Sequence, residues 1–331
     1  MAGAAELIAT GRAGEARTLL RLALEAARRR ADARDEAGCY LLLGFADVAV
    51  EDAAAARTDL AQGAAKLQAR GDGFGAWMGL WMLAEVEKQE GQFTASIARH
   101  EEALAQVARM NASDEPLSFE TFKDLGVFLG LPDELLSLLG PQLALAKPIL
   151  LRFAELVSRD SYGSVLVEAG QLARAETELV LAGDLSHLFG GLLDASVAAH
   201  VGDLRRRQFR LDEARESYRQ ALGSAKSVPS VPFQHGWIEY QILDKLADLE
   251  LLSGRPEEAL AWNERALALA RSQDPRREAS ILDARANLLL RIDRFDAASK
   301  VFGEALALAR KGADASRQGE IWMELGILSM L

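Results

Sequence analysis

Residues 254–267 read GRPEEALAWNERAL, and residues 293–306 follow the same pattern as DRFDAASKVFGEAL. A Gly or Asp opens each phrase, an Ala follows within a few residues, and the phrase closes on Ala-Leu. Weaker or equivalent phrases occur earlier in the chain, at 11–24, 91–104, 170–182 and 209–222. Each copy is anchored by one small residue, in order Ala16, Ala56, Ser96, Ala175, Ala214, Ala259 and Ala298. The spacing of these anchors is nearly constant, except that the step from Ser96 to Ala175 is almost twice as long as the others. Self-similarity at a nearly fixed period predicts a repeat protein.

A second series of small residues runs twelve positions before the first. Only Gly or Ala lets two helix backbones approach closely, and a glycine inside a helix costs about 1 kcal/mol relative to alanine. We therefore expect close helix packing at Gly44, Ala84, Gly126, Gly163, Gly202, Ala247, Ala286 and Gly326. Gly126 falls within the double-length step and predicts a degenerate repeat unit there.

The composition favours an all-α fold. Half of the 331 residues are hydrophobic, only eight are proline, and Ala, Leu, Arg and Glu dominate long stretches. These residues have high helix propensity, whereas proline interrupts helices. Gly254-Arg255-Pro256 has the order expected where one helix ends and the next begins. Each unit therefore reads as a helix, a short turn, a second helix and a loop.

These residues resemble the tetratricopeptide repeat, whose signature is W-x2-L-G-x2-Y followed by A-x3-F. Trp322, Leu325 and Gly326 match its first half, and Ala214 with Tyr218 and Ala298 with Phe302 match its second. The period is about 40 residues, longer than the roughly 34 residues of the standard unit. This period and the phrase ALALAR at 266–271 and 305–310 resemble the long-helix variants of that family. The resemblance implies a right-handed superhelical solenoid of about eight helix-turn-helix repeats. HEAT-type helical repeats have a similar period and are the alternative fold.

Three segments are expected along this array. Residues 1–112 form N-terminal repeats, residues 113–160 form a degenerate repeat interrupted by prolines, and residues 161–331 form C-terminal repeats. The three are expected to be continuous as one solenoid, which could be truncated at Leu331.

Charge and motifs exclude several classes of protein. The net charge of −11 argues against nucleic-acid binding, which needs clustered positive charge. No stretch suits a membrane span or a secretion signal, so a cytoplasmic protein is expected. No catalytic residue, metal site or cofactor site is expected, because no nucleophile elbow, phosphate-binding loop or H-E-x-x-H pair occurs. His100, which precedes Glu101 and Glu102, is interpreted as part of a solvated helix edge.

The resemblance implies a concave groove lined by the first helix of each pair. Offsets of −3, +1 and +4 from the small residues form one helical stripe. This stripe predicts a partner-binding groove that includes Trp81, Glu85, Asp203, Arg206, Asp244, Asp248, Asp283 and Asn287. Family members that bind acidic C-terminal peptides use lysines at such positions, and these lysines are missing here. The aspartates instead predict a basic or mixed-charge ligand.

Two functions fit these features. The first is a non-catalytic scaffold that binds a peptide or a partner domain in the groove. The second is the regulatory region of a larger bacterial signalling protein, such as a kinase, an AfsR- or MalT-type regulator or a CHAT-domain protein. Arrays with the ALALAR phrase resemble the repeats attached to such proteins.

Overall fold

The computed structural model describes residues 2–9, 11–115, 117, 143–226, 235–273, 277–311 and 315–328. These residues form fifteen α-helices: α1 (Ala2–Ala9), α2 (Ala13–Arg29), α3 (Ala33–Ala49), α4 (Ala53–Ala69), α5 (Gly73–Gln89), α6 (Phe93–Ala112), α9 (Leu143–Glu168), α10 (Leu172–Ser186), α11 (Gly191–Arg207), α12 (Leu211–Lys226), α13 (His235–Leu252), α14 (Pro256–Gln273), α15 (Glu278–Leu290), α16 (Phe295–Lys311) and α17 (Ala315–Leu328). The fold class is all-α, as predicted.

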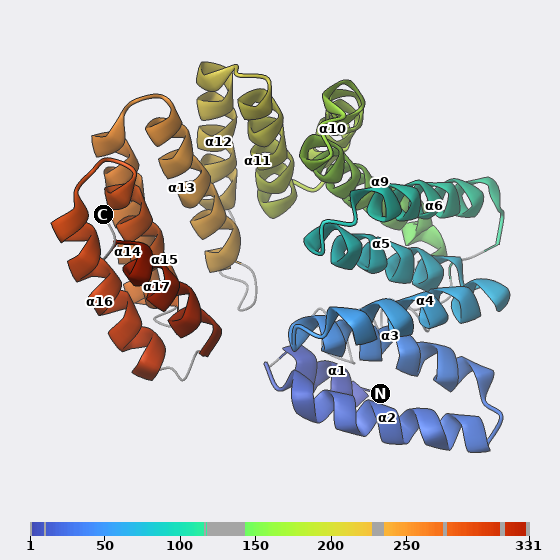
Figure 1. Ribbon diagram of the computed structural model, residues 1–331. Helices are drawn as coiled ribbons and strands as arrows, with labels where there is room; N and C mark the ends of the chain where they lie inside the picture. Colours follow the sequence, from blue (N-terminus) through green and yellow to red (C-terminus); the bar gives the residue numbers. More distant parts are fainter. Residues whose placement is uncertain are drawn as a thin grey trace. The chain divides into compact units, whose positions relative to one another are not determined.

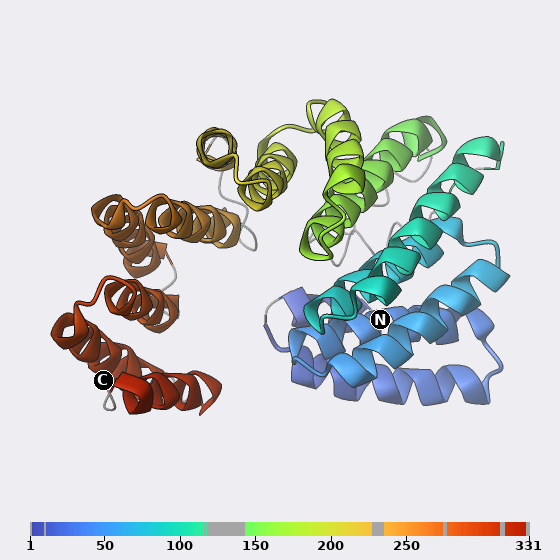
Figure 2. The ribbon, with the colours of Figure 1, turned by 45° about the horizontal axis from the view of Figure 1, so that its top comes forward.

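The chain divides into two compact units, Met1–Phe189 and Gly190–Leu331. Within each unit every helix packs antiparallel against the next along the chain, as Figures 1 and 2 show. The predicted boundary between residues 160 and 161 lies inside α9, where one continuous helix leaves no linker.

Short turns set the helix spacing in the first unit. Helices α2 to α6 start at one constant interval, so that two consecutive helices match one period of the sequence repeat. Asp32, Asp52 and Asp72 cap α3, α4 and α5, each accepting a hydrogen bond from a backbone N–H of the first turn. A capping aspartate of this kind satisfies donors that a helix start otherwise leaves unpaired. In the second unit Gly254 takes a positive φ of 73° immediately before α14 starts at Pro256.

The core repeats with the sequence. The fourth residue after each small anchor is almost fully buried in all seven described units: Leu20, Leu60, His100, Leu179, Tyr218, Asn263 and Phe302. Three of these side chains lie against glycines of the second series. A Cβ on Gly44 would come within 2.4 Å of Leu60, one on Gly163 within 2.6 Å of Leu179, and one on Gly202 within 2.4 Å of Tyr218. At Gly326, by contrast, no described atom lies within 4 Å of such a Cβ.

The helix that follows α6 in the stack is α9. It packs directly against α6 and also contacts α5. These helices are therefore in direct contact, although Ala84 and Gly163 lie two repeat periods apart in the sequence. Gly126, which was expected to anchor that unit, lies outside the described residues. Pro148 lies within α9 instead of interrupting a repeat.

None of the helices in the described ranges is long and apolar enough to cross a lipid bilayer.

Candidate functional site

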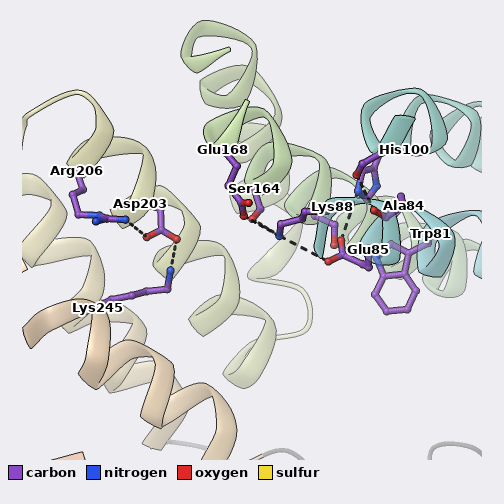
Figure 3. A network of polar contacts seen from close by, with 12 residues as sticks. Trp81, Ala84, Glu85, Lys88, His100, Ser164, Glu168, Asp203, Arg206 and Lys245 are labelled. Atoms are coloured by element: carbon purple, nitrogen blue, oxygen red, sulfur yellow. Dashed lines mark hydrogen bonds and ion pairs between the residues drawn. The ribbon is translucent and has the colours of Figure 1, made fainter. Parts of the chain in front are cut away.

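The predicted groove residues of the second unit start with Asp203 on α11. Its carboxylate accepts hydrogen bonds from the Tyr218 hydroxyl at 2.7 Å and from Lys245 Nζ at 2.6 Å, as Figure 3 shows for the lysine. Arg206, one turn further along α11, lies 3.9 Å from the same carboxylate. Asp203 therefore joins its own helix pair to α13.

The electrostatics of Asp203 follow from these partners. Burial alone would raise the pKa of its carboxyl group, but the electrostatic effects of Lys245 and His200 and the hydrogen bonds from Lys245 and Tyr218 outweigh burial and lower it. Burial and the adjacent carboxylate raise the pKa of Tyr218. The hydroxyl therefore stays protonated and donates a hydrogen bond to Asp203. Asp203 is thus a charged structural link with its oxygens already occupied.

Two more of the predicted acids have cationic partners on the next part of the stack. Asp248 on α13 lies 3.3 Å from Arg291, which follows α15, and Asp283 on α15 lies 3.5 Å from Arg317 on α17. The side chain of Asn287 donates to the carbonyl oxygen of Asp283 at 3.2 Å, one turn back on the same helix. Three of the four predicted groove aspartates therefore have cationic partners on other parts of the chain, which the offsets along single helices could not show.

Asp244 differs from the other three acids. Its side chain is exposed, and no hydrogen bond or ion pair reaches it from the described part of the chain. The surrounding protein partly desolvates it and Asp248 stands one turn away, so both burial and repulsion raise its pKa while Lys245 opposes them. A carboxylate that is accessible yet partly enclosed in this way is a candidate for binding a cation.

In the first unit, three side chains of α5, among them the predicted groove residue Trp81, hold α9 in place. Trp81 Nε1 donates to Ser161 Oγ at 3.0 Å, and the buried Trp77 makes the equivalent bond to Ser158 at 2.8 Å. Lys88 donates to Ser164 Oγ at 2.8 Å (Figure 3). Trp81 is half-buried and stacks on Trp77, with ring centroids 6.2 Å apart. This aromatic stripe is mainly a contact between helices and is not an open binding face.

His100 was interpreted as a solvated residue, and that interpretation is wrong. The side chain is fully buried in α6, and neither ring nitrogen has a hydrogen-bond partner among the described residues. Its Nε2 lies 3.6 Å from Oε1 of Glu85, too long for a hydrogen bond, and its ring stacks on Tyr162 (Figure 3 shows His100 beside Glu85). Burial, with a smaller effect of Lys88, lowers the pKa of His100 to about 3. The sequence signal was its place four residues after the anchor Ser96, where most units carry a core residue.

Replacing His100 with leucine should make the stability of the first unit less sensitive to acid. The native histidine stays neutral down to about pH 3, whereas an unfolded histidine takes up a proton near pH 6.5. The wild-type protein therefore loses stability as the pH falls below 6.5, by about 2 kcal/mol at pH 5, and the variant does not. Urea unfolding at pH 7 and pH 5 measures this difference. His187→Leu is the control because that ring is exposed. If the difference in free energy of unfolding between wild type and His100→Leu stayed constant with pH, His100 would not be a buried neutral histidine.

Comparisons with known proteins agree with this geometry. Residues 239–311 match the family model described as tetratricopeptide repeat. This segment of the second unit is therefore a tetratricopeptide repeat region. This assignment agrees with the antiparallel stacking seen in both units and with the buried fourth residue after each anchor.

Solved structures of three other proteins show a similar fold. The APC/C hetero-tetramer Cut9–Hcn1 matches with a TM-score of 0.57 and 15% identity over 95% of this chain and 47% of that one. Yeast Tom70 matches with a TM-score of 0.51 and 13% identity over 96% of this chain and 59% of that one. The apo form of RapI matches with a TM-score of 0.51 and 12% identity over 87% of this chain and 95% of that one. A search of curated proteins gives no match. The chain thus spans about half the length of the Cut9–Hcn1 chain, and at these identities the similarity concerns the fold alone.

Proposed function

We propose that this tetratricopeptide repeat protein is a non-catalytic scaffold that binds a basic or mixed-charge segment of another protein. Proteins of this family generally mediate protein–protein interactions, and one matching solved structure is itself an assembly of two kinds of chain, Cut9 and Hcn1. The proposal applies equally to a free-standing scaffold and to the regulatory repeats of a larger signalling protein, because both would use the same surface.

The observation that carries the proposal is the state of Asp244 and Asp248 on α13. Carboxylates four residues apart on one helix repel each other, and Asp244 forms no ion pair with the described residues. Asp248 is about half exposed, although Arg291 lies close to it. A positively charged partner segment would relieve this repulsion. The cations that pair with Asp203 and Asp283 reduce the negative charge around them, which favours a partner of mixed charge over a purely basic one.

The test uses the double variant Asp244→Asn with Asp248→Asn. A partner captured with the full chain and identified by mass spectrometry should associate about tenfold more slowly with the double variant at low salt, because electrostatic steering is lost. Its association rate should also depend less on salt. Glu216→Gln is the matched control, since Glu216 is an exposed acid on α12 of the same unit. Equal association rates for the wild type and the double variant at every salt concentration would refute a role for these acids.

A further inference from the structure

The fourth residue after each anchor is buried in every described unit, and in two units it is polar. The position holds Leu, Tyr or Phe in five units, but His100 and Asn263 in the other two. A buried polar side chain costs free energy unless it is fully hydrogen-bonded. Asn263 is therefore a residue that core packing alone does not explain, and it is the one that lines a pocket.

Of the two polar atoms of the Asn263 side-chain amide, only the nitrogen has a hydrogen-bond partner among the described residues. The side chain is 3% exposed, and its Nδ2 donates to the carbonyl oxygen of Ile281 at 3.2 Å. A carbonyl oxygen can only accept, so the amide nitrogen must be the atom that faces Ile281. This contact fixes the amide orientation and leaves Oδ1, which has no hydrogen-bond partner among the residues described, as an acceptor.

Asn263 lines a pocket of about 170 Å³ between α13, α14 and α15, all within the second unit. Drug-sized ligands usually occupy pockets of roughly 300–1,000 Å³, so this one suits a single side chain. The residues with polar side chains around it are Tyr240, Gln241, Asp244, Asn263, Arg277 and Ser280.

The two charged side chains of the pocket, Asp244 and Arg277, differ in the contacts that they make. Asp244, which lacks a cationic partner in the described ranges, supplies a carboxylate in the wall. The guanidinium of Arg277 lies 5.4 Å from the ring centroid of Tyr240, so that cation is held against an aromatic face. The pocket thus combines a carboxylate that forms no ion pair with the described residues and an amide oxygen that lacks a donor among them, and both are hydrogen-bond acceptors.

We propose that this pocket receives the ammonium group of a lysine side chain from the partner protein, with Asp244 and Asn263 Oδ1 as acceptors. The proposal rests on the proposed function and names the recognition site within it. An ammonium carries three donors at one point on a slender stem, which suits separate acceptors in a small pocket. A guanidinium is a planar fork that favours two oxygens of one carboxylate, so arginine is the poorer fit.

The test titrates the full ¹⁵N-labelled chain with capped lysine (Nα-acetyl-lysine N-methylamide) and follows the NMR signals of the Gln241 side chain and the Ile281 backbone amide. Saturable shifts are expected with capped lysine and none with its Nε-acetylated form. Asp244→Asn should weaken binding about tenfold, since it removes a charge-assisted hydrogen bond. Glu216→Gln should leave binding unchanged.

Asn263→Leu separates recognition from structure. Leucine stands at the equivalent position in three other units, so this variant should melt at or above the wild-type temperature. It should nevertheless lose the lysine-induced shifts. If this variant does not fold, Asp244→Asn, at an exposed position, still decides the question.

Other outcomes overturn the proposal in distinguishable ways. Retained binding in Asn263→Leu or in Asp244→Asn, or equal binding of the Nε-acetylated form, would exclude an ammonium site at this pocket. Equal binding of capped arginine would exclude selectivity for lysine, and equal binding of glycine N-methylamide would point to an N-terminal amine. The titration uses capped lysine in place of the natural partner, so a negative result does not contradict the scaffold function. Likewise, a failure of the partner-association experiment does not change how the capped-lysine titration is interpreted.

Discussion

Replacing Glu250 with alanine should lower the free energy of unfolding of the second unit by about 3–5 kcal/mol, because it removes the buried counter-charge of Arg215, which keeps only its ion pair with the exposed Asp212. Glu250 on α13 and Arg215 on α12 are both buried, with Arg215 Nε 2.7 Å from Glu250 Oε1. Arg255 contacts the second carboxylate oxygen of Glu250 at 2.6 Å. The carboxylate thus connects three consecutive elements of the stack. Calorimetry and hydrogen exchange of α12 and α13 measure the loss.

Two further variants test the cause of that loss. Glu257→Ala removes a carboxylate whose ion pair with Arg294 is exposed on both sides, and it should change stability by about 1 kcal/mol or less. The double change Arg215→Met with Glu250→Leu replaces both buried charges by apolar groups and should be much less destabilising than the single change. If Glu250→Ala lowered the free energy of unfolding no more than Glu257→Ala does, the buried pair would not be important for stability.

Replacing Gly202 with leucine should destabilise the second unit by about 3 kcal/mol, at the upper end of the usual cost of overpacking. A Cβ at Gly202 would lie 2.4 Å from Cε1 and 2.5 Å from Cδ1 of Tyr218. The tyrosine ring cannot move aside easily, because it is fully buried and its hydroxyl is bonded to Asp203. Melting temperature and urea unfolding measure the effect.

Alanine substitutions give the matched comparison. Gly223 lies inside α12, and no described atom lies within 4 Å of where its Cβ would be. Gly223→Ala should therefore stabilise the helix by up to about 1 kcal/mol, whereas Gly202→Ala should destabilise it. The same sign at both positions would show that Gly202 is not a close helix contact.

Much of the fold was predictable because local sequence determines helices. The phrases ending in Ala-Leu placed the buried face of each second helix, and Gly254 with Pro256 marked a helix boundary where the structure has one. Sequence spacing alone did not show that α9 packs directly against α6, although their repeat anchors lie two periods apart. Which helix follows another in the stack depends on tertiary contacts, and a count of residues does not contain them.

The candidate site was predictable only in outline. The offsets placed Asp203, Asp244, Asp248 and Asp283 on first helices of their pairs, and the structure agrees that all four lie on α11, α13 or α15. The offsets gave no information on Lys245, Arg291 and Arg317, the cations that oppose three of those acids. Each of these cations lies on a later part of the stack than its acid, about one repeat further along the chain.

The sequence by itself determined the all-α class, the repeat and its buried positions, because helix periodicity and small-residue spacing are local properties of the chain. Only the tertiary structure decided which charges remain unneutralised. It pairs Asp203 with Lys245, leaves Asp244 without an ion pair to the described residues, and places Asn263 at the same pocket as Asp244. Charge pairing depends on distances of a few ångströms between residues of different helices, and those distances are set when the helices stack.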